Sequence, residues 1–490
     1  MTKYYFSAPK PRTTRLFVIV ASALLSACAV GPDYQRPAQD LPQAWGAAPA
    51  GALQAVSAAA QWWKIYADAT LDQLMEEAFA HNVDIAIAAA RVAEAEAQYG
   101  LARSDLIPTI YADGGRSRSR MSERSSQFQD NMPLTTTNNR AALNISYELD
   151  FWGKYRHASE AAKAELLATG AARATLRVTL AAQVAQGYYN LLALDARVTA
   201  TQRTIARGKE ALSLLTQRFE AGMISQFDLQ QRSAEVDAVL AQLPPLEVRR
   251  SAQERALAVL LGRSPRAVIE ETIARGGARA NASTLPLTAP AGLPSDLLLS
   301  RPDLREAEQR LIAANARIGV ARAAYFPSIT LTGSLGSESA ALTDLFSGPA
   351  RTWNFAGNIT QALWGSGRLM REEDLAEARQ RIAVAQYRGA IANAFREVQD
   401  AVAAQVSARE VFEVETRRVA TLTQAYGLAK LRYSNGLSSL LDVIDNERGL
   451  IAAEHNRIEA ERALRAAIAD LYRALGSGTA PDRQDGVPIS

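Results

Sequence analysis

The chain has 490 residues and one cysteine, and 54 Lys and Arg residues against 51 Asp and Glu give it a formal net charge of +3. Four of the basic residues and no acidic residue lie within residues 1–27, so the remainder holds 50 basic against 51 acidic side chains, a net charge of −1. This balance offers no basic patch for nucleic acid. A single cysteine excludes both an intramolecular disulfide framework and a cysteine-based zinc site, so we expect no metal centre.

Residues 1–27 are predicted to form a lipoprotein signal peptide. A basic start precedes a ten-residue apolar run at 16–25, which is too short to span a membrane. Leu-Ser-Ala-Cys follows at once and resembles a bacterial lipobox, in which Cys28 is lipid-modified and becomes the mature N-terminus. The alternative is an ordinary signal peptide with a chance cysteine. Ala29 resembles the residue that directs lipoproteins to the outer membrane. No later segment approaches 18 apolar residues, so any membrane span must use strands.

The chain contains an internal repeat, which predicts two similar halves. Ile-Pro-Thr-Ile at 107–110 recurs as Phe-Pro-Ser-Ile at 326–329, and Arg-Phe-Glu-Ala-Gly at 218–222 recurs as Arg-Tyr-Ser-Asn-Gly at 432–436. The first half spans 72–262 and is predicted to contain a helix, strands at 107–118 and 140–151, a long helix at 155–219 and a helix at 227–261. The second spans 301–476 and is predicted to contain a helix, strands at 327–336 and 352–363, a long helix at 368–433 and a helix at 440–475. Residues 28–71 precede the halves, 263–300 link them, and 477–490 form a tail.

The two long helices are predicted from apolar residues that recur every seven positions, a spacing that favours left-handed supercoiling against a neighbouring helix. One set runs from Val184 to Phe219 and the other from Val384 to Tyr433. Without proline, each stretch can run for roughly 65 residues, about 100 Å. Gly222 and Gly436 are expected to end these helices at tight turns. Ser225 in the first half, and either Ser438 or Ser439 in the second, can cap the returning helices.

The four predicted strands alternate apolar and polar residues over about ten positions, which is typical of a transmembrane β-barrel. The alternative is a half-buried antiparallel sheet of a soluble domain, and the outer-membrane-type lipid anchor favours the barrel. Four strands cannot close a barrel, since about eight are the minimum. We therefore expect a trimer with twelve strands, within a mainly α fold that continues as a long α-helical barrel.

These stretches together resemble the TolC-like outer-membrane efflux channels, and more narrowly their NodT/OprM lipoprotein branch. The resemblance covers the signal to about residue 478 and includes Cys-Ala-Val-Gly-Pro-Asp-Tyr at 28–34, Trp-Trp at 62–63, Gly-Leu-Pro-Ser-Asp-Leu-Leu at 292–298 and Arg-Pro-Asp-Leu at 301–304. It implies a homotrimer anchored by lipid in the bacterial outer membrane, with its helices in the periplasm and residues 28–71 and 263–300 in an equatorial region. It also implies a periplasmic adaptor and an inner-membrane transporter of the RND class as partners, with no catalytic activity and no cofactor.

The resemblance places the working residues at the hairpin turns 220–227 and 434–441, where acidic side chains ring the narrowest aperture. The candidates are Asp228, Asp442, Asp445 and Tyr433. Nine carboxylates in a trimer would concentrate cations at a small opening. The structural alternative for the aspartates is stabilising placement near a helix N-terminus, worth about 0.3–1 kcal/mol. Tyr433 is also the last residue of the seven-residue repeat, so its role stays open.

Gly222 and Gly436 mark the hairpin tips, the predicted docking points for the adaptor. Family members also lock the tip with an arginine, and this chain has Ser438 at the corresponding position, so the resemblance does not supply that lock. The predicted function is a passive duct that carries small toxic compounds from the transporter to the outside. Alternatives are a channel for type I protein secretion and a membrane-anchored structural coiled coil without a pore. The sequence does not distinguish drug, dye, detergent and metal as cargo.

Overall fold

The computed structural model describes residues 30–42, 54–56, 60–126, 128–129, 131–276, 280–290, 297–364 and 366–478. The predicted signal peptide, the lipidation site at Cys28 and most of the tail lie outside the described residues. The chain forms two compact units, and each takes segments from both halves of the sequence. We call them the strand unit (Met1–Ala38, Ala93–Ala168 and Ala307–Tyr387) and the hairpin unit (Gln39–Val92, Thr169–Glu306 and Arg388–Ser490).

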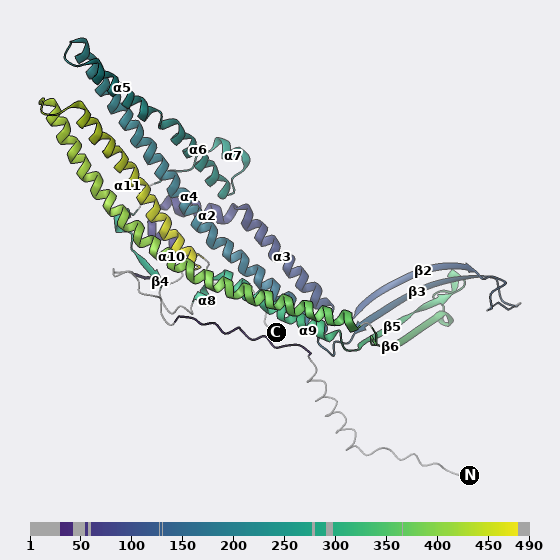
Figure 1. Cartoon of the computed structure of the whole chain (residues 1–490). Coiled ribbons are helices and arrows are strands. Elements are labelled where there is room, and N and C mark those ends of the chain that lie inside the picture. Colours follow the sequence, from purple (N-terminus) through teal and green to yellow (C-terminus); the bar gives the residue numbers. More distant parts are fainter. Residues whose placement is uncertain are drawn as a thin grey trace, which may run out of the picture. The chain divides into compact units, whose positions relative to one another are not determined.

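The order of elements repeats between the two halves of the chain (Figure 1). The first half contains β1 (Gln54–Val56), the 3-10 helix η1 (Trp62–Tyr66), α2 (Ala69–His81), α3 (Val83–Ser104), β2 (Thr109–Arg120), β3 (Thr135–Glu148), α4 (Lys154–Glu220), α5 (Gln226–Leu240), α6 (Leu243–Leu260) and α7 (Pro265–Glu270). The second contains η2 (Ala282–Thr284), β4 (Thr288–Pro290), α8 (Leu297–Ser300), α9 (Pro302–Ala323), β5 (Ser328–Ser339), η4 (Leu342–Asp344), η5 (Gly348–Ala350), β6 (Arg351–Thr360), α10 (Ser366–Ser434) and α11 (Leu440–Ala474).

The two long helices, α4 and α10, have 67 and 69 residues. The helix expected over 227–261 is divided into α5 and α6. Pro244 and Pro245 occupy the first turn of α6, where proline's missing N–H removes no intrahelical hydrogen bond. The equivalent segment in the second half has no proline and forms the single helix α11. Among the described residues, no helix is both long and apolar enough to cross a membrane.

The strand unit contains one antiparallel sheet with the order β2-β3-β5-β6 (Figure 1). Because side chains alternate between the faces of a strand, the register gives the sheet an apolar face and a polar face. The apolar face carries exposed Ile110, Leu143, Ile145, Leu331, Leu335, Trp353, Phe355 and Ile359. The polar face carries Asn144, Ser146, Glu148, Thr330, Thr332, Ser334, Asn354, Asn358 and Thr360.

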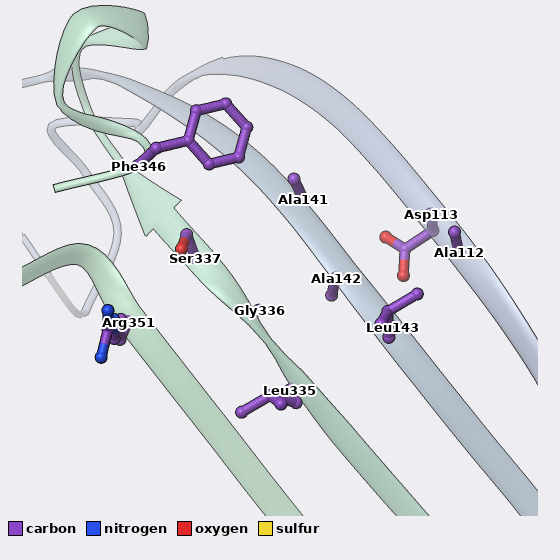
Figure 2. Close-up of a pocket in the computed structure, with 10 residues that line it drawn as sticks. All are labelled: Ala112, Asp113, Ala141, Ala142, Leu143, Leu335, Gly336, Ser337, Phe346 and Arg351. Carbon is purple, nitrogen blue, oxygen red and sulfur yellow. The ribbon is translucent and has the colours of Figure 1, made fainter. Parts of the chain in front are cut away.

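A shallow hollow lies on this sheet at the end of the β5–β6 connection (Figure 2). Phe346 comes from that connection, and Asp113 and Arg351 border the hollow on strands β2 and β6. Its floor consists of small residues because the strands approach closely there: a Cβ on Gly336 would lie about 2.4 Å from the Ala141 carbonyl oxygen. Glycine at 336 is therefore needed for β3 and β5 to pair in this register.

The N-terminal segment of the strand unit is attached to α9 by side-chain hydrogen bonds. The Arg36 guanidinium donates to both carboxylate oxygens of Glu308, at 2.6 and 2.8 Å, and the Tyr34 hydroxyl donates to the same carboxylate at 3.1 Å. Asn315 Nδ2 donates to the carbonyl oxygen of Pro32 at 2.7 Å. These bonds fix residues 32–36, which belong to the stretch directly after the predicted lipidation site.

An aromatic cluster lies within the hydrophobic core of the hairpin unit. Trp62 stacks on Tyr472 with ring centroids 5.1 Å apart, and fully buried Tyr66 packs edge-on against Tyr189. The Tyr66 hydroxyl donates to the carbonyl oxygen of Arg465 at 2.6 Å, which satisfies the only polar group of this buried ring. The cluster therefore joins η1 to α4 and α11.

The Arg-Pro-Asp motif at 301–303 has a structural role in the hairpin unit. The buried Arg301 guanidinium pairs with Asp303 at 2.6 Å and with Glu397 at 2.9 Å, and it donates to the carbonyl oxygen of Ala474 at 2.7 Å. Neutralisation by two carboxylates and a carbonyl offsets the cost of burying this charge. The motif connects the start of α9 to α10 and to the end of α11.

Candidate gate at the helical hairpin ends

The two helical hairpins of the hairpin unit end in turns of the same construction. Gly222 follows α4 and Gly436 follows α10, each with a φ of +72°, the left-handed conformation that costs other residues about 1 kcal/mol or more. The Gly222 and Gly436 N–H groups donate to the carbonyls of Phe219 and Tyr433, at 2.8 and 3.0 Å. The next N–H in each turn donates at 2.8 Å to the carbonyl of Arg218 or Arg432. These bonds satisfy the last carbonyls of both long helices.

Each returning helix begins with a capping box, in which a serine and an aspartate three residues later satisfy each other's backbone N–H. Ser225 Oγ accepts from the Asp228 N–H at 3.2 Å, and Asp228 Oδ2 accepts from the Ser225 N–H at 3.4 Å. In the second hairpin the corresponding distances between Ser439 and Asp442 are 3.3 and 2.9 Å. Ser439, not Ser438, is therefore the cap.

Two of the predicted aperture aspartates thus hold helix N-termini. The backbone N–H of Ser439 and, after it, the Ser439 hydroxyl hold the pKa of Asp442 below its usual value, so this exposed carboxylate stays charged at neutral pH. In both boxes the oxygen that accepts is Oδ2. Asp442 therefore combines a structural contact with a negative charge at the hairpin end.

Asp445 lies one turn after Asp442 on α11 and is not part of the cap. Its Oδ1 is 3.7 Å from Arg448 Nη1, and its side chain is 59% exposed. Arg448 is held mainly by Glu235 of α5, with distances of 2.5 and 2.7 Å from Nη2 and Nε to Oε2. The structure therefore places Asp445 beside a salt bridge between the two returning helices.

Tyr433 packs into a small apolar cluster below the turn of the second hairpin. The cluster consists of buried Leu215, Leu440 and Ile444, with half-buried Ile224, Leu229 and Tyr433 packed against them. The position of Tyr433 thus agrees with its place in the seven-residue repeat. Ser438 beside it has a buried Oγ without a hydrogen-bond partner in the described part of the chain.

Arg232 of α5 and Glu447 of α11 form a buried ion pair that is not predicted from the sequence. Their side chains are 5% and 10% exposed, and Nη1 lies 2.5 Å from Oε2. Tyr426 of α10 lies near this pair. Its burial, and after that the negative charge of Glu447, raises the pKa of its hydroxyl. Arg232 and Glu447 are 215 positions apart in the sequence. The one sequence signal for the pair is that each is a charged residue on a helix with an apolar pattern.

Among the residues that the structure describes, no three His, Cys, Asp or Glu side chains are grouped to hold a metal ion. Cys28, the predicted lipidation residue, lies outside the described residues. The predicted site residues Asp228, Asp442, Asp445, Tyr433, Gly222 and Gly436 all belong to the hairpin unit. Gly222 and Gly436 lie in the two turns, Tyr433 just before the second turn, and the three aspartates after the turns.

Comparison with known proteins identifies the family. The model of the outer membrane efflux protein family matches residues 74–263 and 293–477. The cation efflux system protein CusC of Escherichia coli K12 is 32% identical over 470 residues, 95% of this chain and 99% of CusC. The probable efflux pump outer membrane protein TtgC of Pseudomonas putida KT2440 is 34% identical over 468 residues, 94% of this chain and 95% of TtgC.

Solved structures show the same fold. The Campylobacter jejuni CmeC outer membrane channel superposes with a TM-score of 0.87 at 25% identity, covering 92% of this chain and 95% of CmeC. The open-state MtrE outer membrane channel of Neisseria gonorrhoeae gives a TM-score of 0.80 at 30% identity, covering 92% and 98%. The predicted TolC-like fold class is confirmed. The chain belongs to the outer membrane efflux protein family and, as the sequence predicts, is the outer-membrane channel of a tripartite efflux system, a homotrimer that works with a periplasmic adaptor and an inner-membrane transporter.

Proposed function

We propose that the two hairpin ends form the gated periplasmic entrance of a passive duct, with Asp228, Asp442 and Asp445 around the opening. The observation that carries this proposal is the concentration of negative charge at two matched turns. Each turn is followed by an aspartate in a capping box, and the second carries Asp445 one turn further on. A ring of such carboxylates attracts cations and repels anions in a narrow pore.

Within this proposal the residues have different tasks. Asp228 and Asp442 hold the helix starts and contribute charge, whereas Asp445 contributes charge without a capping bond. Tyr433 supports the turn from the apolar cluster below it. Gly222 and Gly436 allow the tight turns that present the tips to the adaptor.

Three further parts of the assignment are proposals. Cys28 carries the lipid that anchors the N-terminus, and mass spectrometry of the mature N-terminal peptide would test this. The chain has no catalytic activity, in keeping with a family of channels. The cargo is a set of small toxic compounds that passes without a dedicated site: relatives of similar identity are named for cation efflux, antibiotic efflux and toluene efflux.

The gate is tested by planar-bilayer conductance of the purified full chain. Asp445→Asn removes a charge without removing a cap, so we expect lower cation preference and altered conductance at low salt. Glu459→Gln is the matched control, because Glu459 also pairs with an arginine three residues later on α11 and is 50% exposed. Asp442→Asn is the second test variant, in which both the charge and the cap change.

Cation selectivity that falls in Asp445→Asn and not in Glu459→Gln supports an aperture at the tip. Wild-type selectivity in both Asp445→Asn and Asp442→Asn would keep the channel and remove these aspartates as its gate. Absence of any conductance from a correctly folded wild-type trimer would contradict the duct itself.

A further inference from the structure

We propose that arginines on the apolar face of the strand unit's sheet bind the phosphate groups of a membrane lipid. The charged side chains of β2, β3, β5 and β6 are divided between the two faces by sign. The apolar face carries Arg116, Arg118, Arg120 and Arg351 and no acidic residue on these strands. The polar face carries the acidic residues Asp113, Glu148 and Glu338, together with Arg140.

The arginines lie just beyond the rows of apolar side chains on the same face of the sheet. Leu143, Leu335 and Trp353 pair across β3, β5 and β6 and form its last apolar row. The next row on the same face contains Arg351, and the one after it contains Arg116. Rows on one face are about 7 Å apart. Along the strands, Arg351 therefore lies about 7 Å and Arg116 about 14 Å beyond the last apolar row. A strand tilt of about 40° reduces these depths to about 5 and 11 Å, in or just beyond the headgroup layer that begins where the apolar core ends.

Three of these four arginines carry uncompensated charges. Arg116, Arg118 and Arg351 are exposed and form no ion pair with any carboxylate in the described residues. Arg120, at the far end of β2, has Glu123 at 3.6 Å. Arg140, on the polar face, has Asp113 at 3.8 Å. On the four strands, the arginines without an ion pair among the described residues all lie where the apolar face ends.

A phosphorylated lipid fits both properties of this surface. Its acyl chains cover the exposed apolar side chains, and its phosphates accept hydrogen bonds from guanidinium groups, which match phosphate geometry in a bidentate way. Arg351, Leu143, Leu335 and Phe346 also border the hollow in Figure 2, and Asp113 borders it from β2. Phe346 is 84% exposed, which is typical of an aromatic side chain at a lipid–water interface.

Because the arginines lie on the outer strands of the sheet, neighbouring copies in the homotrimer would share the lipid site. Arg116 lies on β2 and Arg351 on β6, the two outer strands of the sheet. When β6 of one copy pairs with β2 of the next, the arginines of both strands meet at the junction. Each junction then presents a cluster of guanidinium groups to one lipid.

The test is native mass spectrometry of the purified full-length trimer, titrated in detergent with defined lipids. The probes are bisphosphorylated lipid A, its monophosphoryl form and phosphatidylcholine, and inorganic phosphate is the competitor. One arginine at an anionic lipid surface strengthens binding about fivefold. We therefore expect R116S/R118S/R351S to weaken binding of the bisphosphorylated lipid on the order of a hundredfold. Wild type should bind the monophosphoryl form more weakly and phosphatidylcholine weakest.

Two variants make the result specific. R140S removes an arginine from the opposite face and should leave lipid binding unchanged. R116K/R118K/R351K keeps the charges and should retain most of the preference, which separates loss of binding from loss of fold. Equal binding of all three lipids by wild type would overturn the proposal, as would an R140S effect as large as that of the triple serine variant. Displacement of the lipid by millimolar inorganic phosphate would identify a free-phosphate site and not a lipid site.

Discussion

Arg232 of α5 and Glu447 of α11 form a buried ion pair that joins the returning helices of the two hairpins. Beside it, Arg448 of α11 pairs with Glu235 of α5. Each of the two helices therefore contributes one arginine and one glutamate to this pair of salt bridges. Buried pairs of this kind owe their effect on stability mainly to the cost of leaving one partner alone. The stability of the hairpin ends therefore depends on both members being present.

Replacing Glu447 by Gln should destabilise α5 and α11 by about 3–5 kcal/mol, because Arg232 remains buried without a counter-charge. Hydrogen–deuterium exchange of the two helices in the full chain measures this change. Asp400→Asn is the control: its partner Arg396 is on the surface, with both side chains over 60% exposed, and the expected cost is below about 0.5 kcal/mol. The double replacement Arg232→Met/Glu447→Leu should recover most of the loss. Equal protection in Glu447→Gln and wild type would contradict a structural role for the pair.

Ser439→Ala should cost about 1 kcal/mol at the start of α11, since it removes the cap that accepts from the Asp442 N–H. The adjacent replacement Ser438→Ala should be neutral or slightly stabilising, because the Ser438 hydroxyl is buried without a partner in the described residues. Local exchange rates at 440–443 distinguish the two variants. The same loss in both would show that the cap assignment is wrong.

Gly436→Ala should destabilise the second hairpin by about 1–2 kcal/mol, through backbone conformation alone. A Cβ there would meet no atom within 4 Å, but φ is +72°. Gly427→Ala in the interior of α10 also meets open space and has the opposite expected sign, a gain of about 0.5–1 kcal/mol. Thermal unfolding of the two variants should therefore shift in opposite directions. A shift in the same direction would exclude conformation as the cause.

His455 of α11 should make the hairpin unit less stable at mildly acidic pH. Burial, with a further contribution from Arg197, lowers the pKa of this imidazole below its usual value, and its Nε2 lies 3.4 Å from Thr201 Oγ1. The unfolded chain then binds the proton first, so stability falls as pH drops from about 6.5 towards the lowered folded pKa, and no further below it. His455→Gln should remove this part of the pH dependence when unfolding is followed between pH 7.5 and 5. An unchanged profile would exclude His455 as its source.

Much of the fold could be predicted because the repeating patterns are local. The seven-residue spacing and the absence of proline predict two long helices at 155–219 and 368–433, and the observed ends lie within two residues of these bounds. The alternation in β3, β5 and β6 predicts which side chains share a face. The choice of Ser439 over Ser438 was also available from sequence. Ser439 has an aspartate three residues later, as Ser225 does, and this spacing defines a capping box.

The rest of the site depends on contacts between distant segments. The pairing of Arg232 with Glu447 requires the register of α5 against α11, which no local pattern specifies. The packing of Tyr433 required knowing that Leu215 and Ile444 lie beside it. The division of residues 227–261 into α5 and α6 is different, because Pro244 and Pro245 indicated it and the single-helix prediction gave them too little weight.

The outer position of β2 and β6 has a consequence for biogenesis. Each has ten or more residues whose outward backbone groups find no partner strand within the described chain. In lipid, each unpaired N–H or carbonyl costs several kcal/mol, so a single copy cannot settle in the membrane and then wait for others. Insertion and association must occur together, and the yield of functional channel should rise more steeply than the supply of chains. At low expression, copies that find no partners cannot insert their strands and stay open to degradation.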